Sequence, residues 1–223
     1  MAFLRQEGFV KPADLAQVSV AIIGAGSIGS FTALALTKMG VKKLTLIDKD
    51  NVELHNVSNQ FFIREDLGKA KVDATMTECL RQSPEKDLDV LVRNEFYDGT
   101  QQLDADIVIV LTDNIEGRAT AFKAASESFA TKFFIDGRMG GELFRLFAFD
   151  PHDLKLSEKY REEFLDGVAN SEEPCTARTI IYNVLLASSF ISSYVKKYTC
   201  REKIPFQLAY AFGDMIQVKS KEE

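Results

Sequence analysis

The distribution of apolar and polar positions predicts a strand–turn–helix–strand unit near the start of the chain. Residues 18–23 form a short apolar run, typical of a strand that is buried on both faces. A G-x-G-x-x-G turn begins at Gly24 and leads into residues 31–39, which carry apolar side chains at helical spacing. A second strand over 43–47 follows and ends in Asp48.

This unit has the pattern of a nucleotide-binding site. Gly24 allows a tight turn, Gly26 lets a phosphate approach the backbone, and Gly29 lets the helix pack on the strand. The start of the helix offers free N–H groups and partial positive charge to an anion. Asp48, at the tip of the next strand, is placed to accept hydrogen bonds from ribose hydroxyls. The alternative is that the glycines serve only the turn.

The rest of the pattern predicts a single α/β domain over residues 1–223. Further strands are expected over 88–93, 105–111, 132–136 and 142–149, helices over 71–82, 115–129 and 177–198, and a terminal hairpin over 205–218. The expected fold is Rossmann-like: a mainly parallel, doubly wound sheet with antiparallel C-terminal strands, the strand over 142–149 having one wet face. Residues 1–17 form an N-terminal arm. Residues 151–175 form a crossover loop without periodicity, and such long loops are usually functional.

Composition limits the classes of function. The net charge of -6 gives no reason to expect a nucleic-acid partner. Three widely spaced cysteines without a C-x-x-C pair suit a reducing compartment and exclude a cysteine zinc site. The first residues lack the apolar region of a signal peptide, and the uncharged stretch over 179–195 is short for a membrane span. We therefore expect a cytoplasmic protein with no membrane or zinc.

Several polar residues fall where ligands bind in open α/β sheets, at the carboxyl ends of the parallel strands. Thr112-Asp113-Asn114 ends one predicted strand, which makes Asp113 a candidate for Mg²⁺ or phosphate; it could equally be a helix N-cap. Lys71 lies in the first turn of a helix, an unfavourable place for a cation unless it faces an anion. The other candidates follow the two strands directly: Asp50, Asn56, Asn59 and Arg118.

With these residues in order, the chain resembles the ThiF/MoeB and ubiquitin-activating enzyme superfamily over about residues 3–198. The matching positions are Arg5-Gln6, Gly24, Gly26, Gly29, Asp48, Asp50, Asn56, Lys71, Thr112-Asp113-Asn114, Arg118 and Pro174-Cys175-Thr176. The resemblance implies an adenylation domain that uses ATP and Mg²⁺. In it the C-terminal carboxylate of a small β-grasp protein, ubiquitin-like or a sulfur carrier, attacks the α-phosphate of ATP.

The resemblance also implies a role for each matched residue. Asp48 and Asp50 would hold the ribose, Asn56 and Lys71 the phosphates, and Asp113 the Mg²⁺. Arg5 would reach into the site of a partner subunit, which implies a homodimer. The cofactor-binding set is Gly24, Gly26, Gly29, Asp48, Asp50, Asn56, Asn59, Lys71 and Arg118, and the catalytic set is Arg5, Lys71, Asp113 and Cys175.

Cys175 matches the position of the thioester cysteine of ubiquitin-activating enzymes. It lies just before a predicted helix N-terminus, where the thiolate is favoured, so it could take the acyl group from the adenylate. The alternative is a small buried residue that caps the helix. A conjugating enzyme is then a further possible partner, although no domain for handing on cargo is evident.

One departure from the superfamily pattern affects the phosphate site. Asn59 stands where the family usually has an arginine, which removes a phosphate contact; Arg64, Arg118 or Arg138 are the candidates to replace it. Three other functions stay open. These are adenylation of a non-protein carboxylate such as a tRNA base or a peptide, a dinucleotide-dependent dehydrogenase, and a degenerate binder of a ubiquitin-like partner without catalysis.

Overall fold

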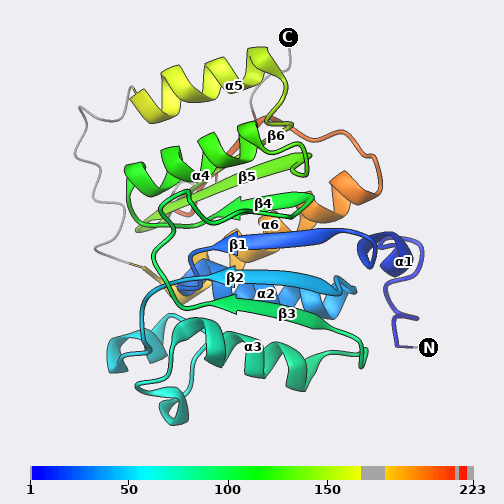
Figure 1. Ribbon diagram of the computed structural model, residues 1–223, viewed down its shortest axis with the longest axis vertical. Coiled ribbons are helices and arrows are strands. Elements are labelled where there is room, and N and C mark those ends of the chain that lie inside the picture. Colours follow the sequence, from blue (N-terminus) through cyan, green and yellow to red (C-terminus); the bar gives the residue numbers. More distant parts are fainter. Residues whose placement is uncertain (1, 167–178, 214–215, 220–223) are drawn as a thin grey trace.

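The computed structural model describes residues 2–166, 179–213 and 216–219, and these residues form one eight-stranded sheet (Figure 1). The strand order is β3-β2-β1-β4-β5-β6-β7-β8. The parallel strands are β1 (Ser19–Ile23), β2 (Lys43–Ile47), β3 (Asp89–Arg93), β4 (Ile107–Val110) and β5 (Phe133–Gly140). The antiparallel strands are β6 (Leu143–Phe149), β7 (Gln207–Ala211) and β8 (Ile216–Lys219). The predicted fold class is confirmed.

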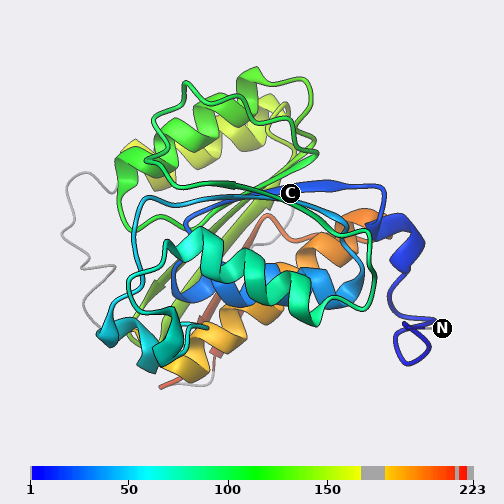
Figure 2. The same ribbon diagram turned by 60° about the horizontal axis from the view of Figure 1, so that its bottom comes forward.

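Helices cover both faces of the sheet, with α2, α3 and α6 on one face and α4 and α5 on the other (Figures 1 and 2). The α-helices are α1 (Pro12–Leu15), α2 (Ser27–Met39), α3 (Lys71–Gln82), α4 (Ile115–Glu127), α5 (Leu154–Tyr160) and α6 (Ile181–Thr199). Three short helices join them: η1 (Leu54–Ser58), η2 (Arg64–Asp66) and the π-helix η3 (Arg161–Asp166). None of the described helices is both long and apolar enough to span a membrane.

The central strands explain why the sequence shows unbroken apolar runs. All four residues of β4 are buried, yet they belong to two separate cores. Ile107 and Ile109 pack with the α2 and α6 side, whereas Val108 and Val110 pack with the α4 and α5 side. Because strand side chains alternate between faces, a sheet covered on both faces requires apolar residues at every position.

The antiparallel strand β6 has less wet surface than its alternating sequence predicts. Phe144 is stacked on Phe190 of α6, on one face of the sheet. Phe147 and Phe149 are buried on the other face, against Tyr160 of α5. The expected wet face is therefore covered by a helix over much of its length.

That helix is itself a correction to the predicted crossover loop over 151–175. The segment begins with α5 and η3 rather than with irregular structure. Asp153 caps α5, because its side chain accepts a hydrogen bond from the Leu156 N–H (3.1 Å). Its seven residues are too short for a periodic pattern, and a single side chain, Tyr160, provides most of the anchoring in the core. Cys175 and its neighbours lie outside the described residues.

Candidate functional site

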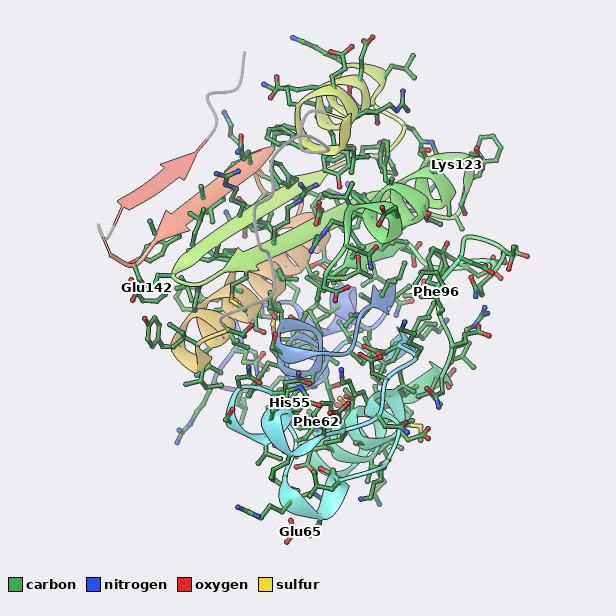
Figure 3. The ribbon with its side chains drawn as sticks, turned by 90° about the vertical axis from the view of Figure 1, so that its left-hand side faces the viewer. His55, Phe62, Glu65, Phe96, Lys123 and Glu142 are labelled. Atoms are coloured by element: carbon green, nitrogen blue, oxygen red, sulfur yellow. The ribbon has the colours of Figure 1, made fainter. Side chains whose placement is uncertain are left out.

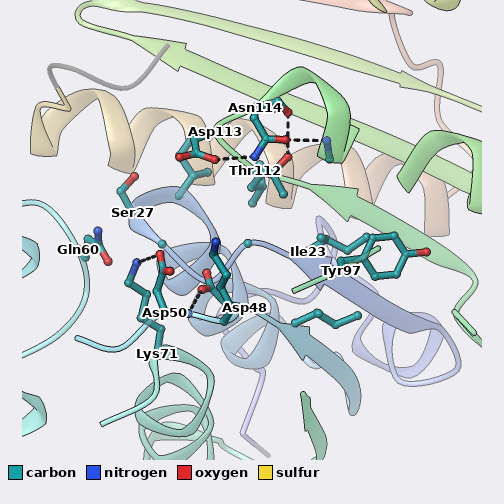
Figure 4. Close-up of a pocket in the computed structure, with 18 of the residues that line it drawn as sticks. Ile23, Ser27, Asp48, Asp50, Gln60, Lys71, Tyr97, Thr112, Asp113 and Asn114 are labelled. Atoms are coloured by element: carbon teal, nitrogen blue, oxygen red, sulfur yellow. Dashed lines mark hydrogen bonds and ion pairs between the residues drawn. The ribbon is translucent and has the colours of Figure 1, made fainter. Parts of the chain in front are cut away.

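A cavity of about 580 Å³ opens at the carboxyl ends of the parallel strands. Figure 3 looks onto this edge, with His55 and Phe96 on either side of it, and Figure 4 shows the cavity itself. Asp48, Asp50 and Lys71 lie on one side of it and Thr112, Asp113 and Asn114 on the other. The predicted residues that line it are Gly24, Gly26, Asp48, Asp50, Asn56, Asn59, Lys71, Asp113 and Arg118.

The three glycines of the turn have three different structural reasons. Gly24 has a φ of +99°, and a Cβ there would lie 2.8 Å from the carbonyl oxygen of Leu111. A Cβ on Gly29 would lie 1.9 Å from the carbonyl oxygen of Gly24, so only glycine lets α2 start this close to the strand. A Cβ on Gly26 would have no atom within 4 Å, since it faces the cavity. Gly26 therefore marks the open space where a ligand can approach the backbone.

The start of α2 is free to bind an anion. Gly26 is its N-cap, and no side chain of the described residues accepts a hydrogen bond there. The helix is 13 residues long, so its first N–H groups carry the partial positive charge of a full helix end. Ser27, the first residue of the helix, also lines the cavity, although the sequence pattern gave no reason to select it.

Asp48 is held by two backbone groups. The Ala25 N–H donates to its Oδ2 (2.7 Å) and the Asp50 N–H donates to its Oδ1 (2.8 Å). Burial raises the pKa of this carboxyl above its ordinary value of 3.8, and the hydrogen bond from Asp50 and the charge of Lys71 offset this only in part. Each oxygen keeps a lone pair that can accept a hydroxyl proton from a sugar.

Lys71 is a buried cation aimed at the cavity from the start of α3. Its side chain is 9% exposed, and its Nζ lies 2.9 Å from Oδ2 of Asp50. The two residues are also joined through the backbone, because the Lys71 N–H donates to the Asp50 carbonyl oxygen (2.9 Å). An ammonium group has three donors, so two remain for a ligand.

Two asparagines on the loop after β2 are used in different ways. Asn56 is buried, and its Oδ1 accepts from the Glu53 N–H (2.8 Å), which closes the first turn of η1. Only its NH₂ group can then serve a ligand. Asn59 donates a long hydrogen bond from Nδ2 to the carbonyl oxygen of Thr179 (3.5 Å), so it contacts the residue with which the described chain resumes. Its Oδ1 is buried without a partner among the described residues.

Asp113 is free of a structural role in helix capping. The N-cap of α4 is Asn114, whose Oδ1 accepts from the Gly117 N–H (2.7 Å). Asn114 also donates from Nδ2 to Oδ1 of Asp113 (3.1 Å), which orients the exposed carboxylate. The alternative interpretation of Asp113 as the N-cap is therefore wrong, and its side chain faces the cavity (Figure 4).

Arg118 lines the cavity, but its guanidinium is engaged with protein groups. It donates to Asp136 and to the carbonyl oxygens of Gly137 (3.1 Å) and Thr112. This geometry fixes the turn that presents Asp113, and it fits a supporting role better than a direct phosphate contact.

Asp136 stands at the centre of a buried charge cluster, defined here as Arg118, Asp136, Arg138 and Tyr160. Arg138 donates from Nε to Oδ2 of Asp136 (2.7 Å), and the Tyr160 hydroxyl donates to the same oxygen (2.6 Å). Burial by itself would raise the pKa of Asp136, but Arg118 and Arg138 together hold it below its ordinary value. Sequence reasoning missed this cluster, although two charged residues at the end of a buried strand were its signal.

The three arginines suggested as replacements at position 59 are thus not direct ones. Arg64 is exposed in η2, and neither it nor Arg138 lines the cavity. Arg5 is exposed in the N-terminal arm, at the opposite end of α2 from the cavity: its neighbour Gln6 donates to the carbonyl oxygen of Lys38 (2.9 Å). Arg5 therefore does not contribute to the cavity of its own chain.

The far end of the cavity is apolar and suits a flat ring. Ile47, Tyr97 and Leu111 line it, and Lys49 lies over the ring of Phe96 (5.3 Å to the centroid). Phe96 and Tyr97 come from the segment after β3, which the sequence marked only as the close of a strand. The cavity thus combines an apolar end, a carboxylate for hydroxyls, and an anion-binding helix start.

The described part of the chain holds no group of three or more His, Cys, Asp or Glu side chains suited to a metal ion. A magnesium ion bound through substrate phosphates needs only one or two carboxylates from the protein, and Asp113 fits that requirement. Of the thiols, Cys79 is buried, which raises its pKa to about 11 and disfavours the thiolate.

Comparison with known proteins identifies the family. The ThiF family model matches residues 3–206. The chain belongs to the ThiF family. It is 33% identical over 152 residues to the ubiquitin-like modifier-activating enzyme 5 of Culex quinquefasciatus, and 31% identical over 141 residues to that of Aedes aegypti. These matches cover 60% and 56% of this chain but only 37% and 35% of those enzymes, so the chain spans about a third of their length.

Solved structures of low sequence identity share the fold. PaaA superposes with a TM-score of 0.76 at 22% identity, covering 97% of this chain and 68% of PaaA. MccB of E. coli, solved with AMPCPP and MccA, superposes with a TM-score of 0.74 at 18% identity, covering 94% of this chain and 65% of MccB. At these identities the likeness establishes the Rossmann-like fold alone.

Proposed function

We propose that this ThiF-family protein adenylates the C-terminal carboxylate of a small ubiquitin-like or sulfur-carrier protein at the expense of ATP. The observation that carries the proposal is the convergence of Asp48, Lys71 and Asp113 on one cavity beside an open helix start. A dehydrogenase needs only the acid at the strand tip and would leave Lys71 and Asp113 without a function. The named relatives activate ubiquitin-like modifiers, and MccB was solved with AMPCPP.

ATP fits the cavity in one direction. Its adenine would lie at the apolar end near Tyr97, and its ribose hydroxyls would donate to Asp48. The phosphates would then pass the open face of Gly26 and the N–H groups of α2, within reach of Lys71. Asp50 holds the Lys71 ammonium group in place.

The chemistry requires positioning and charge neutralisation more than proton transfer. A carboxylate oxygen attacks the α-phosphorus, the bond to the bridging oxygen breaks, and pyrophosphate leaves with the negative charge. Mg²⁺ held by Asp113 would neutralise charge on the phosphates. Lys71 would stabilise the charge that develops on the leaving group, and the orientation of Asp113 by Asn114 would limit its movement.

A second, covalent step on Cys175 belongs to the proposal. The Cys175 thiolate would attack the acyl carbon of the adenylate, forming a thioester and releasing AMP. Arg5 would complete the site of a partner subunit in a homodimer; its distance from its own cavity is compatible with that role. We place the protein in the cytoplasm and treat residues 1–223 as one adenylation domain, with a conjugating enzyme as a possible later partner.

The substrate is the least constrained part. The MccB structures contain MccA, so a peptide or another small carboxylate is a second candidate class. The test is incubation of the protein with Mg-ATP and small β-grasp proteins encoded near its gene, followed by intact-mass spectrometry. We expect a β-grasp protein carrying one AMP, and a reductant-labile adduct that Cys175→Ala abolishes. Binding of the β-grasp protein without any adenylate would support the non-catalytic alternative instead.

A further inference from the structure

The charges that line the cavity do not by themselves favour a triphosphate. Four carboxylates line it against three cationic side chains: Asp48, Asp50, Glu95 and Asp113 against Lys49, Lys71 and Arg118. Lys49 lies over Phe96 and Arg118 binds Asp136, so Lys71 is the main lysine or arginine of the described lining that can contact a phosphate. Asn59, in the place of the expected arginine, adds no charge. An additional source of positive potential is therefore required near the cavity.

The buried charge cluster has the charge that the cavity lacks. Asp136 is fully buried, and Arg118 and Arg138 are 4% and 9% exposed. Two guanidinium groups thus share one carboxylate, and no other carboxylate of the described residues forms an ion pair with either. Burial and Asp136 keep the pKa of Tyr160 well above its ordinary value, so its hydroxyl stays neutral. The cluster therefore carries one surplus positive charge behind the cavity wall.

The second arginine is more than the local packing requires. Arg118 alone already balances Asp136. Arg138 also donates to the carbonyl oxygen of Phe164 in η3 (2.9 Å) and lies over the ring of Phe147 (5.1 Å to the centroid), but a neutral amide could donate to that carbonyl. A buried guanidinium without its own carboxylate is costly, and a neighbouring anion offsets that cost.

We propose that Arg138, although buried and outside the cavity, strengthens the binding of the polyphosphate part of the nucleotide through its charge. It acts through the Asp136–Arg118 pair, because Arg138 neutralises the Asp136 charge that would otherwise cancel Arg118. Arg118 contacts the Thr112 turn at the cavity wall, so the uncancelled charge faces the phosphates. This inference rests on the proposed function, since it takes ATP as the ligand.

The test compares ATP with adenosine by isothermal titration calorimetry without added metal. Arg138→Met leaves Asp136 balanced by Arg118 and removes the surplus charge. We expect ATP to bind roughly tenfold more weakly, the effect of a unit charge about 12 Å away at an effective dielectric constant of about 20. The affinity for adenosine stays unchanged, because adenosine has no phosphate. Arg138→Lys keeps the charge and preserves the preference for ATP.

Two matched variants separate charge from structure. Arg161→Met removes a cation from the same region, but that residue is exposed and screened by solvent, so the preference for ATP stays. Tyr160→Phe disturbs the cluster without changing its charge and also leaves the preference intact. If circular dichroism shows that Arg138→Met does not fold, Arg138→Gln gives the same comparison and keeps a donor for Phe164.

The outcomes distinguish this inference from the proposed function. If the wild-type protein binds ATP but Arg138→Met loses affinity for ATP and adenosine equally, Arg138 has only a structural role and the inference is wrong. The same conclusion follows if neither affinity changes. If the wild-type protein binds no ATP at all, the proposed function fails first.

Discussion

The Nζ of Lys71 lies 2.9 Å from Oδ2 of Asp50, although the two residues come from different elements and are 21 positions apart. Asp50 follows β2 and is half exposed, whereas Lys71 begins α3 and is nearly buried. The pair therefore fixes a cation at a helix start, where the dipole would otherwise disfavour it. A fixed cation facing a cavity is what a phosphate site needs.

Replacement of this cation tests that interpretation. In Lys71→Met we expect ATP–pyrophosphate exchange to fall on the order of 100-fold, as for the loss of one preorganised donor to a developing charge. Folding should be little affected, because the remaining Asp50 carboxylate is solvated. Lys69→Met is the control: Lys69 is exposed, pairs with Asp66 and does not line the cavity. Equal losses in the two variants would contradict the assignment.

The glycine turn gives a prediction with two opposite signatures. Gly26→Ala places a methyl group in open space, so the melting temperature should hold while ATP affinity falls. Gly29→Ala drives a methyl group against the Gly24 carbonyl oxygen, so the fold itself should lose about 1–3 kcal/mol or more. Thermal unfolding and ATP titration of both variants measure the difference. A normal ATP affinity in Gly26→Ala would place the phosphates elsewhere.

Asp113 should matter only when metal is present. Asp113→Asn removes the proposed Mg²⁺ ligand, so ATP–pyrophosphate exchange should fall by about 3 kcal/mol of transition-state stabilisation, roughly 100-fold. Added Mg²⁺ should restore part of the rate. Asp104→Asn changes an exposed carboxylate outside the cavity and should exchange normally. Full exchange in Asp113→Asn at low Mg²⁺ would overturn the role.

The raised pKa of Asp48 predicts a dependence of ligand binding on pH. Its ionised form accepts the ribose hydroxyls, so adenosine affinity should fall as the pH drops through the raised value, starting above the ordinary 3.8. The folded state also holds this proton more tightly than the unfolded state. The contribution of Asp48 to the free energy of unfolding therefore decreases as the pH rises through that window.

The control for this experiment is Asp48→Asn. It should bind adenosine more weakly than the wild-type protein. It should also lack the acid-dependent loss, since any titration of adenosine itself would occur with both proteins. Parallel pH profiles for the two proteins would show that Asp48 does not contact the ribose.

The sequence predicted those parts of the molecule that follow from local pattern. The unbroken apolar runs of β1 and β4 identified buried parallel strands, and the end of each strand located the polar side chains of the cavity. Parallel topology alone brings such strand ends to one edge. This is why Asp48 and Asp113, which are 65 positions apart, could be assigned to one site.

The features that the sequence did not predict depend on tertiary contacts. Arg118 seemed free to face a ligand because its partner, Asp136, comes from another strand. The helix α5 gave no periodic signal, since Tyr160 provides most of its anchoring. Asn114 and Asp113 are equally good N-caps by residue type, and only the geometry of the turn selects Asn114.

The central claim is that the cavity joins ATP to an incoming acyl terminus. The most direct measurement is ATP–pyrophosphate exchange with Mg-ATP and a β-grasp protein in two forms, one with a free C-terminal carboxylate and one with that terminus amidated. We expect exchange only with the free carboxylate, since only that group can attack the α-phosphate. Equal exchange with both forms, or none with any β-grasp partner while NADH binds tightly and ATP does not, would contradict the account.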